Sequence, residues 1–272
     1  MVVMSHNNEY FSVQENELND LFLEKGYVLG EVQNIDALEK IRKTVVDLAT
    51  MYLGQSQPDY EGTLDQIHTN IHLKNLNDMR LNIIQQLNEI SWLRVEYFKL
   101  ARYMLETIVG NELAMQLRIN LSIQLPEDDS SLLPVHADVW SGDSPFEAVV
   151  WLPLVKCYGT KSMFLLPPEH ARELSKRFDD FKGKGSEYLF QAIRDDLTWI
   201  DIDYGQVLIF NQNLPHGNRT NRERETRWSL NCRFKSVFSP YGDKKLGEFF
   251  EPITLRATSR IGMDYRYPGV QD

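Results

Sequence analysis

Two histidines and one aspartate are the residues of this sequence best suited to hold a metal ion. His136 and Asp138 are separated by one alanine in "LLPVHADVW", and His216 follows 80 residues later in "NLPHGN". Side chains two apart on a strand point to the same face, so His136 and Asp138 can converge on one point. Two histidines and a carboxylate form the facial triad typical of non-heme Fe(II), whereas zinc sites more commonly use three histidines or a glutamate. The plainer alternatives are a surface His–Asp hydrogen bond and a turn histidine after Pro215.

A row of polar side chains follows the second histidine. In "RWSLNCRFK", polar and apolar residues alternate, which on a strand gives one wholly polar face. Arg227 and Ser229, eleven and thirteen residues beyond His216, could hold a carboxylate through charge-assisted hydrogen bonds. An edge strand with its polar side in water would show the same pattern. A metal triad followed by a carboxylate anchor is more specific than either part, and it favours a dicarboxylic cosubstrate that chelates iron at one end.

The elements that would position these residues change in character near residue 115. Apolar residues recur at three- and four-residue steps over 35–52, 76–90 and 93–108, which predicts helices along a mostly helical flank, 1–115. From 116 to 238, short apolar or alternating segments predict strands, interrupted by a helical insertion at about 169–195. Uneven connections favour a jelly roll over a parallel sheet. Residues 239–272, rich in glycine, proline and aromatic residues, are expected to cap the barrel mouth, and 1–272 to form one domain.

Composition excludes several classes of function. The formal charge of −10 and the lack of a basic stripe argue against a nucleic-acid partner and against docking on an anionic membrane. Two cysteines are too few for a disulfide framework or a cysteine-rich zinc site. No signal-peptide pattern or long apolar run is present, so a cytoplasmic protein is expected. Phosphate-binding glycine loops and a G-x-S-x-G elbow are also missing. Oligomeric state is left open.

With these motifs in place, the sequence resembles the Fe(II)/2-oxoglutarate oxygenases, especially the phytanoyl-CoA dioxygenase-like branch. Within that branch, "NLSIQLPEDDSSLLPVHADVWSGDSPFE" and "RWSLNCRFKSVFSPYG" look like the StrG-type proteins of streptomycin biosynthesis and carbohydrate clusters. The resemblance covers roughly residues 116–242 and implies a double-stranded β-helix, a cupin-like jelly roll that is mainly β and is flanked by the N-terminal helices.

The resemblance also implies roles for individual residues. His136, Asp138 and His216 would bind Fe(II), and Arg227 with Ser229 would bind the far carboxylate of 2-oxoglutarate. Trp151 and Asn218 match family positions that line the cosubstrate pocket.

Four further candidates rest on strand alternation alone. Asn120 and Gln124 share a face and could touch the cosubstrate from the side opposite Arg227, or they could face solvent. Arg233 could reach the cosubstrate or an anionic substrate, or pair with an acidic neighbour. Trp140 could stack on a sugar ring or be a core or rim aromatic.

The implied reaction converts 2-oxoglutarate to succinate and carbon dioxide and oxidises an unactivated C–H bond, so the sequence needs no acid–base dyad. The StrG-type resemblance predicts a sugar or aminosugar derivative as substrate. Two other classes stay open: a cupin-type, non-oxidative sugar isomerase or epimerase, and a catalytically silent binding module. The carboxylate anchor argues against the first, and the intact triad argues against the second.

Overall fold

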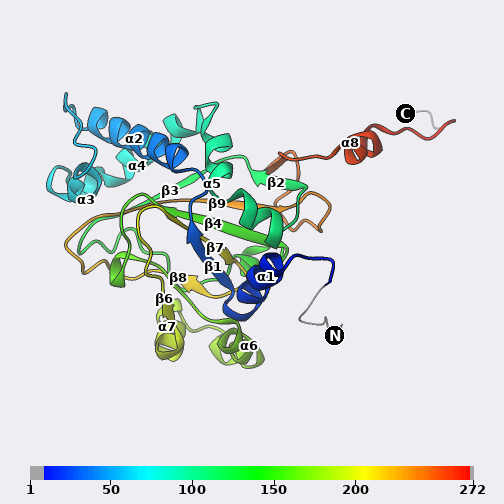
Figure 1. Ribbon diagram of the computed structural model, residues 1–272. Helices are drawn as coiled ribbons and strands as arrows, with labels where there is room; N and C mark the ends of the chain where they lie inside the picture. Colours follow the sequence, from blue (N-terminus) through cyan, green and yellow to red (C-terminus); the bar gives the residue numbers. More distant parts are fainter. Residues whose placement is uncertain (1–8, 270–272) are drawn as a thin grey trace.

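The computed structural model describes residues 9–269, so the predictions for residues 1–8 and 270–272 lie outside the described part. A large antiparallel sheet runs through the centre of the protein (Figure 1). Its strands, in spatial order, are β1 (Tyr27–Glu31), β7 (Gln206–Asn211), β4 (Glu147–Pro153), β9 (Arg227–Ser236), β2 (Leu113–Gln116) and β10 (Phe250–Pro252), with β3 (Asn120–Gln124) also paired to β9.

A second, smaller sheet faces part of the first. It consists of β6 (Thr198–Trp199), β5 (Phe164–Leu165) and β8 (His216–Gly217), in that order. An isolated antiparallel bridge between His136 and His216 ties the connection after β3 to this small sheet. Two antiparallel sheets with uneven connections form a jelly roll, so the predicted fold class, mainly β with N-terminal helices, is confirmed.

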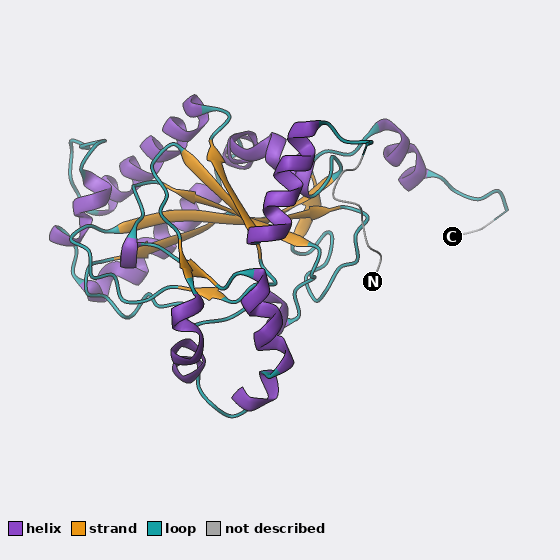
Figure 2. Cartoon of the chain, turned by 60° about the horizontal axis from the view of Figure 1, so that its bottom comes forward, coloured by secondary structure: helices purple, strands orange, loops and turns teal. Residues whose placement is uncertain are grey.

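Helices cover the large sheet on its outer face (Figures 1 and 2). The N-terminal helices are α1 (Val13–Lys25), α2 (Ile35–Tyr52), α3 (Thr63–Gln66), α4 (Leu73–Asn88) and α5 (Leu93–Ile108). The helices predicted at 35–52, 76–90 and 93–108 correspond to α2, α4 and α5, whose apolar stripes are buried. In the region predicted as a helical insertion, α6 (Pro168–Lys176) and α7 (Ser186–Ile193) lie beside the small sheet.

Strand β9 is the longest strand of the described residues, and the side chains on its apolar face pack against the helices. Trp228 is fully buried, and its indole N–H donates to the carbonyl of Leu64 in α3 at 2.8 Å. Tyr97 of α5 is also fully buried, and its hydroxyl donates to the carbonyl of Val150 in β4 at 2.9 Å. Buried aromatic side chains whose polar atoms are satisfied hold the strands firmly. Since side chains alternate along β9, its polar row must face the opposite way, toward the small sheet.

The alternating segment 116–125 holds the end of one strand and the whole of another, because Gln116 is the last residue of β2 and β3 spans Asn120–Gln124. β2 pairs with the C-terminal part of β9, and β3 pairs with its N-terminal part. Between them, the side chain of Asn88 binds both backbone groups of Ile119: its Oδ1 accepts from the amide at 2.8 Å, and its Nδ2 donates to the carbonyl at 2.9 Å. This contact replaces ladder hydrogen bonds and fixes the end of α4 beside the start of β3.

The C-terminal segment adds one strand and one helix. β10 pairs with β2, and α8 (Ala257–Asp264) projects from the body of the molecule (Figure 1). Within the described residues, none of this segment lines the central cavity, so its function as a cap stays a prediction. No helix among residues 9–269 combines the length and apolar character needed to cross a membrane.

Candidate metal and cosubstrate site

The polar face of β9 forms one wall of a cavity of about 490 Å³ between the two sheets. Strand register places Asn231 between Asn120 of β3 and Trp151 of β4, and it places Arg233 beside Val149. His216 of β8 and His136 line the same cavity from the opposite side. A cavity of this size is typical of small-molecule sites.

Backbone hydrogen bonds bring the three predicted metal ligands together. His136 and His216 exchange both backbone bonds, at 3.0 and 2.8 Å, and their ring centroids are 4.3 Å apart. The amide of Asp138 donates to the carbonyl of Gln212 at 3.1 Å, which holds the aspartate beside the bridge. One ligand atom from each of the three residues lies within 4.8 Å of the others. Asp138 itself begins a short 3-10 helix, so the pair sits at the end of a bridge and not within a regular strand.

The hydrogen bonds of the two imidazoles leave the same nitrogen available on each ring. Nδ1 of His136 lies 2.8 Å from the carbonyl oxygen of Pro134, and Nδ1 of His216 lies 2.9 Å from that of Leu214. A carbonyl only accepts, so Nδ1 of each ring carries a proton, and Nε2 is the nitrogen that can offer a lone pair. Burial and the neighbouring His136 lower the pKa of His216 to about 4, so this ring is neutral at neutral pH. In both rings, Nε2 is therefore the nitrogen that is available to a metal ion.

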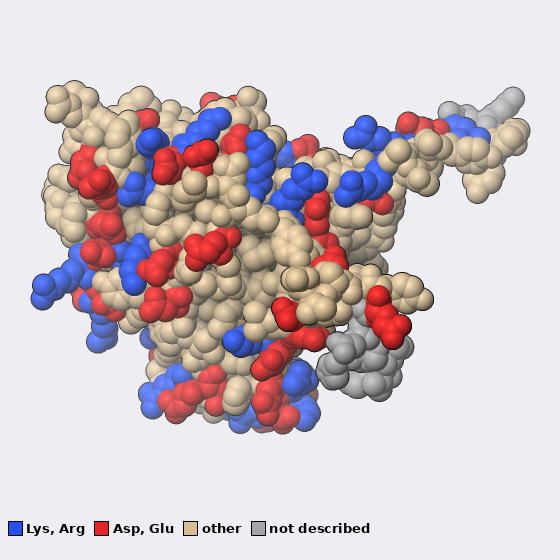
Figure 3. Space-filling model, viewed as in Figure 1, with Lys and Arg blue, Asp and Glu red and all other residues tan. Residues whose placement is uncertain are grey.

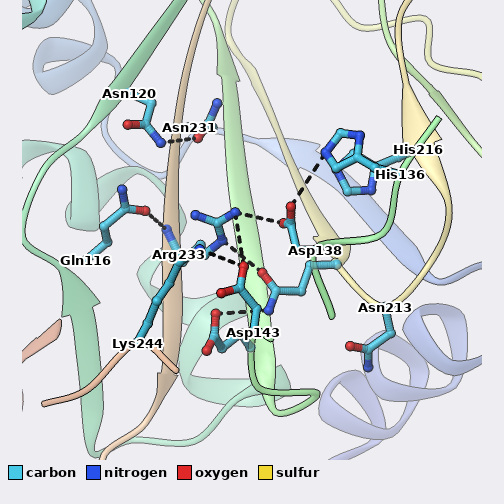
Figure 4. Close-up of polar contacts among 12 residues, drawn as sticks. Gln116, Asn120, His136, Asp138, Asp143, Asn213, His216, Asn231, Arg233 and Lys244 are labelled. Carbon is cyan, nitrogen blue, oxygen red and sulfur yellow. Dashed lines mark hydrogen bonds and ion pairs between the residues drawn. The ribbon is translucent and has the colours of Figure 1, made fainter. Parts of the chain in front are cut away.

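Arg233 holds the carboxylate of Asp138 from the side away from the histidines (Figure 4). Its Nη2 lies 3.0 Å from Oδ2 of Asp138 and 3.5 Å from Oδ2 of the buried Asp143, while its Nε donates to Gln212 at 3.0 Å. The other oxygen of Asp138, Oδ1, lies 3.6 Å from Nε2 of His136. One aspartate oxygen is thus paired with the guanidinium, and the other is directed toward the histidines.

This arrangement predicts an effect of Arg233 on metal affinity. We expect Arg233→Met to weaken binding of Ni(II) about 10- to 100-fold, because partners that orient a ligating carboxylate contribute that much to affinity. Isothermal titration calorimetry on the purified protein measures it. Lys244→Met is the matched control, since Lys244 binds Asp143 at 2.6 Å, whereas the ion pairs of Asp138 are with His136 and Arg233. Equal loss of affinity in both variants would contradict a specific contribution of Arg233.

Arg227 is a buried cation without an acidic partner. Only 2% of the residue is exposed, and its guanidinium donates to the carbonyl of Ser162 at 3.2 Å and to Oγ of Ser122 at 3.0 Å. Among residues 9–269, no carboxylate forms an ion pair with it. Burial lowers the pKa of Arg227 to about 10, which still leaves it charged at neutral pH. A buried charge of this kind is costly unless an anion compensates it.

Unsatisfied polar atoms gather on and around this arginine. Nε of Arg227 has no hydrogen-bond partner, and the same holds for the hydroxyls of Ser162 and Ser229 and for Oε1 of Gln124. Gln124 lies opposite Arg227 in the β3–β9 register, and Ser229 is two residues along the same face. Buried polar groups are nearly always paired, so a cluster of unpaired ones indicates a missing polar ligand or bound water. The donor set, one guanidinium and two hydroxyls, suits a carboxylate.

The remaining predicted site residues lie in three different settings. Trp151, Asn218 and Asn120 line the cavity; Asn218 accepts from the amide of Leu133 at 2.6 Å, and Asn120 donates to Asn231 at 3.0 Å (Figure 4). Gln124 is fully buried beside the cavity and donates to the carbonyl of Arg219. Trp140 lies outside the cavity lining, 44% exposed and packed on Phe178.

Several residues that line the cavity or bind its lining were not predicted from the sequence. Ser122 binds Arg227, Gln212 binds Arg233, and Arg80 reaches the cavity from α4. Ser122 shares the strand alternation that singled out Asn120 and Gln124, so a signal for it existed. Arg80 lies on a helix with a single apolar stripe, and nothing in its local sequence marks it.

Comparisons of sequence identify no relative. No protein-family model matches the chain, and no curated protein matches it. Solved structures do match. The chain superposes on ThoJ, a non-heme monooxygenase in complex with nickel, with a TM-score of 0.55 and 16% identity, over 89% of this chain and 85% of that one. This chain shares the fold of ThoJ.

Two further structures give the same result. AviO1 from Streptomyces viridochromogenes Tue57 matches with a TM-score of 0.52 and 14% identity, over 85% of this chain and 99% of that one. The apo form of EctD from S. alaskensis matches with a TM-score of 0.51 and 14% identity, over 85% and 79% of the two chains. At such identities, the likeness establishes the common fold and leaves the chemistry to be argued from the site.

Proposed function

We propose that this protein is an Fe(II)- and 2-oxoglutarate-dependent oxygenase that oxidises a small molecule. The observation that carries the proposal is the unpaired, buried guanidinium of Arg227 in the same cavity as His136, Asp138 and His216. A metal triad alone fits many reactions. A triad that shares its cavity with a buried carboxylate anchor suits a keto acid with a second carboxylate. The fold shared with a nickel-bound non-heme monooxygenase agrees with this assignment.

Each group of residues at the cavity would have a separate function. His136, Asp138 and His216 would hold Fe(II), with Nε2 of both rings and Oδ1 of Asp138 as the ligand atoms. Arg227, Ser229 and Ser162 would bind the far carboxylate of 2-oxoglutarate and so orient its keto acid end toward the triad. When bound, iron and 2-oxoglutarate supply the oxidation: dioxygen, 2-oxoglutarate and a C–H group give succinate, carbon dioxide and a C–OH group. Trp151, Val149 and Phe210 supply the apolar lining that excludes water.

The alternatives leave parts of the site without a function. A non-oxidative isomerase or epimerase on this fold would need no dicarboxylate, so the unpaired atoms around Arg227 would have no ligand. A catalytically silent binding module would not need two histidines whose Nε2 atoms are available to a metal ion.

The proposal is tested with the purified protein, Fe(II) and 2-oxoglutarate. Without oxygen, we expect a visible charge-transfer absorption as the keto acid chelates the metal. With oxygen, we expect slow formation of succinate even when no substrate is added. Asp138→Ala serves as the negative control for both measurements. Absence of both signals in the unaltered protein would reject the proposed function.

We further propose a sugar-containing substrate, supported by the StrG-type resemblance of residues 116–242 and by the mixture of amide, hydroxyl and aromatic groups in the cavity. A panel of sugar derivatives and acyl-CoA thioesters tests it. We expect only sugar derivatives to stimulate succinate formation and to gain the mass of one oxygen atom. Stimulation confined to the acyl-CoA thioesters would overturn the sugar assignment and leave the oxygenase assignment intact.

A further inference from the structure

Arg80 brings a third guanidinium group to the cavity, besides Arg227 and Arg233. It lies on α4, about two turns before Asn88, whose side chain ties the end of that helix to Ile119 at the start of β3. The helix therefore runs along β3, and Arg80 lines the cavity together with Asn120, Leu121 and Ser122 of that strand. Its Nη2 donates a hydrogen bond to Oδ1 of Asn77 on its own helix, at 2.5 Å.

The other charges around the cavity already have partners. Arg233 is paired with Asp138 and Asp143, and Lys244 is also paired with Asp143. Arg227 would be compensated by one carboxylate of 2-oxoglutarate, and the metal ion by the other. Within the described part of the chain, Arg80 forms no ion pair. It is therefore the cationic residue of the cavity lining whose charge neither the protein nor 2-oxoglutarate neutralises.

The cavity lining contains few acidic groups among the described residues. Among residues 9–269, Asp138 is the only acidic residue that lines it. The nearby Asp128 is buried and turned into its own loop, where it accepts from the amide of Ser130 at 2.7 Å and from the hydroxyl of Ser131 at 2.8 Å. Ser130 and Ser131 themselves line the cavity. The hydroxyl of Ser131 is thus engaged by Asp128, and the lining offers the guanidinium of Arg80 and the hydroxyl of Ser130, groups of the kind that bind a carboxylate or a phosphate.

We infer that the substrate carries an anionic group, a carboxylate or a phosphate ester, which Arg80 binds. This inference rests on the proposed function, because it assigns 2-oxoglutarate to Arg227. The inference concerns the charge of the cavity lining and not that of the whole molecule, which is formally −10. On the face shown in Figure 3, acidic and basic side chains are interspersed. Net charge would favour a cationic aminosugar at long range, whereas the cavity lining favours a sugar acid or a sugar phosphate.

The test uses four matched probes: glucuronate, glucose 6-phosphate, neutral glucose and cationic glucosamine. Binding is measured by calorimetry to protein saturated with Ni(II) and 2-oxoglutarate, so that the probes cannot occupy the cosubstrate site. We expect at least one anionic probe to bind about tenfold or more tightly than glucose, and glucosamine to bind no better than glucose. Comparing glucuronate with glucose 6-phosphate distinguishes a carboxylate from a phosphate.

Substitutions then assign the effect to Arg80. Arg80→Gln should remove the preference for the anionic probe, and Arg80→Lys should keep part of it, while the affinity for 2-oxoglutarate stays unchanged in both. Arg118→Gln is the matched control, because Arg118 is exposed in the neighbouring β2–β3 connection and does not line the cavity. The inference is overturned if 2-oxoglutarate binds but neither anionic probe binds more tightly than glucose, or if Arg80→Gln leaves the preference intact. Failure of 2-oxoglutarate to bind would instead reject the proposed function.

Discussion

His216→Ala is expected to reduce Fe(II)-dependent formation of succinate to background and to abolish tight binding of Ni(II). Its Nε2 is one of three ligand atoms that lie within 4.8 Å of one another, and two remaining ligands hold a divalent ion poorly. His136→Ala should have the same effect. Because both rings line the cavity and neither belongs to the hydrophobic core, we expect the metal-free variants to unfold at nearly the same temperature as the unaltered protein.

His170→Ala is the control for these variants. His170 lies in α6, is half-exposed and does not line the cavity, and its Nδ1 lies 3.5 Å from Oδ1 of Asp196. We expect it to keep both metal binding and turnover. Retained turnover in His216→Ala, measured with added Fe(II) and 2-oxoglutarate, would rule out the triad, whereas equal losses in His170→Ala would point to a general effect on the fold.

The parts of the site that the sequence predicts are those encoded in short-range patterns. Alternation along 227–235 predicts a polar strand face, and β9 has that face turned into the cavity. The H-x-D spacing predicts convergence of His136 and Asp138, which the structure reaches through a β-bridge and a 3-10 turn. Helices with clear apolar stripes are also where they were expected, because periodic burial is a property of the segment itself.

What the sequence does not predict depends on contacts between distant segments. The pairing of Arg233 with Asp138 joins residues 95 positions apart, and alternation left Arg233 with three open interpretations. Arg80 reaches the cavity from α4, whose end the side chain of Asn88 ties to Ile119 just before β3. For Trp140, the short-range pattern itself misleads, because its spacing from Asp138 suggested the same strand face. The 3-10 turn that begins at Asp138 instead places Trp140 outside the cavity lining, against Phe178. Strand alternation fails at the point where the strand ends.

The burial of Arg227 suits its proposed function as an anchor for a carboxylate. A guanidinium in water gains little from pairing with a carboxylate, whereas a buried one with unpaired Nε and two neighbouring free hydroxyls gains much more. The loss of a charge-assisted contact of this kind costs about 1.5–3 kcal/mol, or roughly 10- to 100-fold in affinity. Arg227→Met should therefore raise the KM for 2-oxoglutarate by at least that factor, and Arg227→Lys should recover only part of it, because an ammonium lacks the planar fork.

Pyruvate separates this specific contribution from a general loss of structure. It has the keto acid end of 2-oxoglutarate but no second carboxylate, so Arg227 should give the unaltered protein a strong preference for 2-oxoglutarate. In Arg227→Met that preference should nearly disappear, and binding of Ni(II), which depends on the triad, should remain. Affinities of both keto acids for the Ni(II)-loaded protein, measured by calorimetry in the two proteins, provide the comparison. If Arg233→Met removes the preference and Arg227→Met keeps it, then the far carboxylate is bound by Arg233, and the unpaired donors around Arg227 serve another ligand.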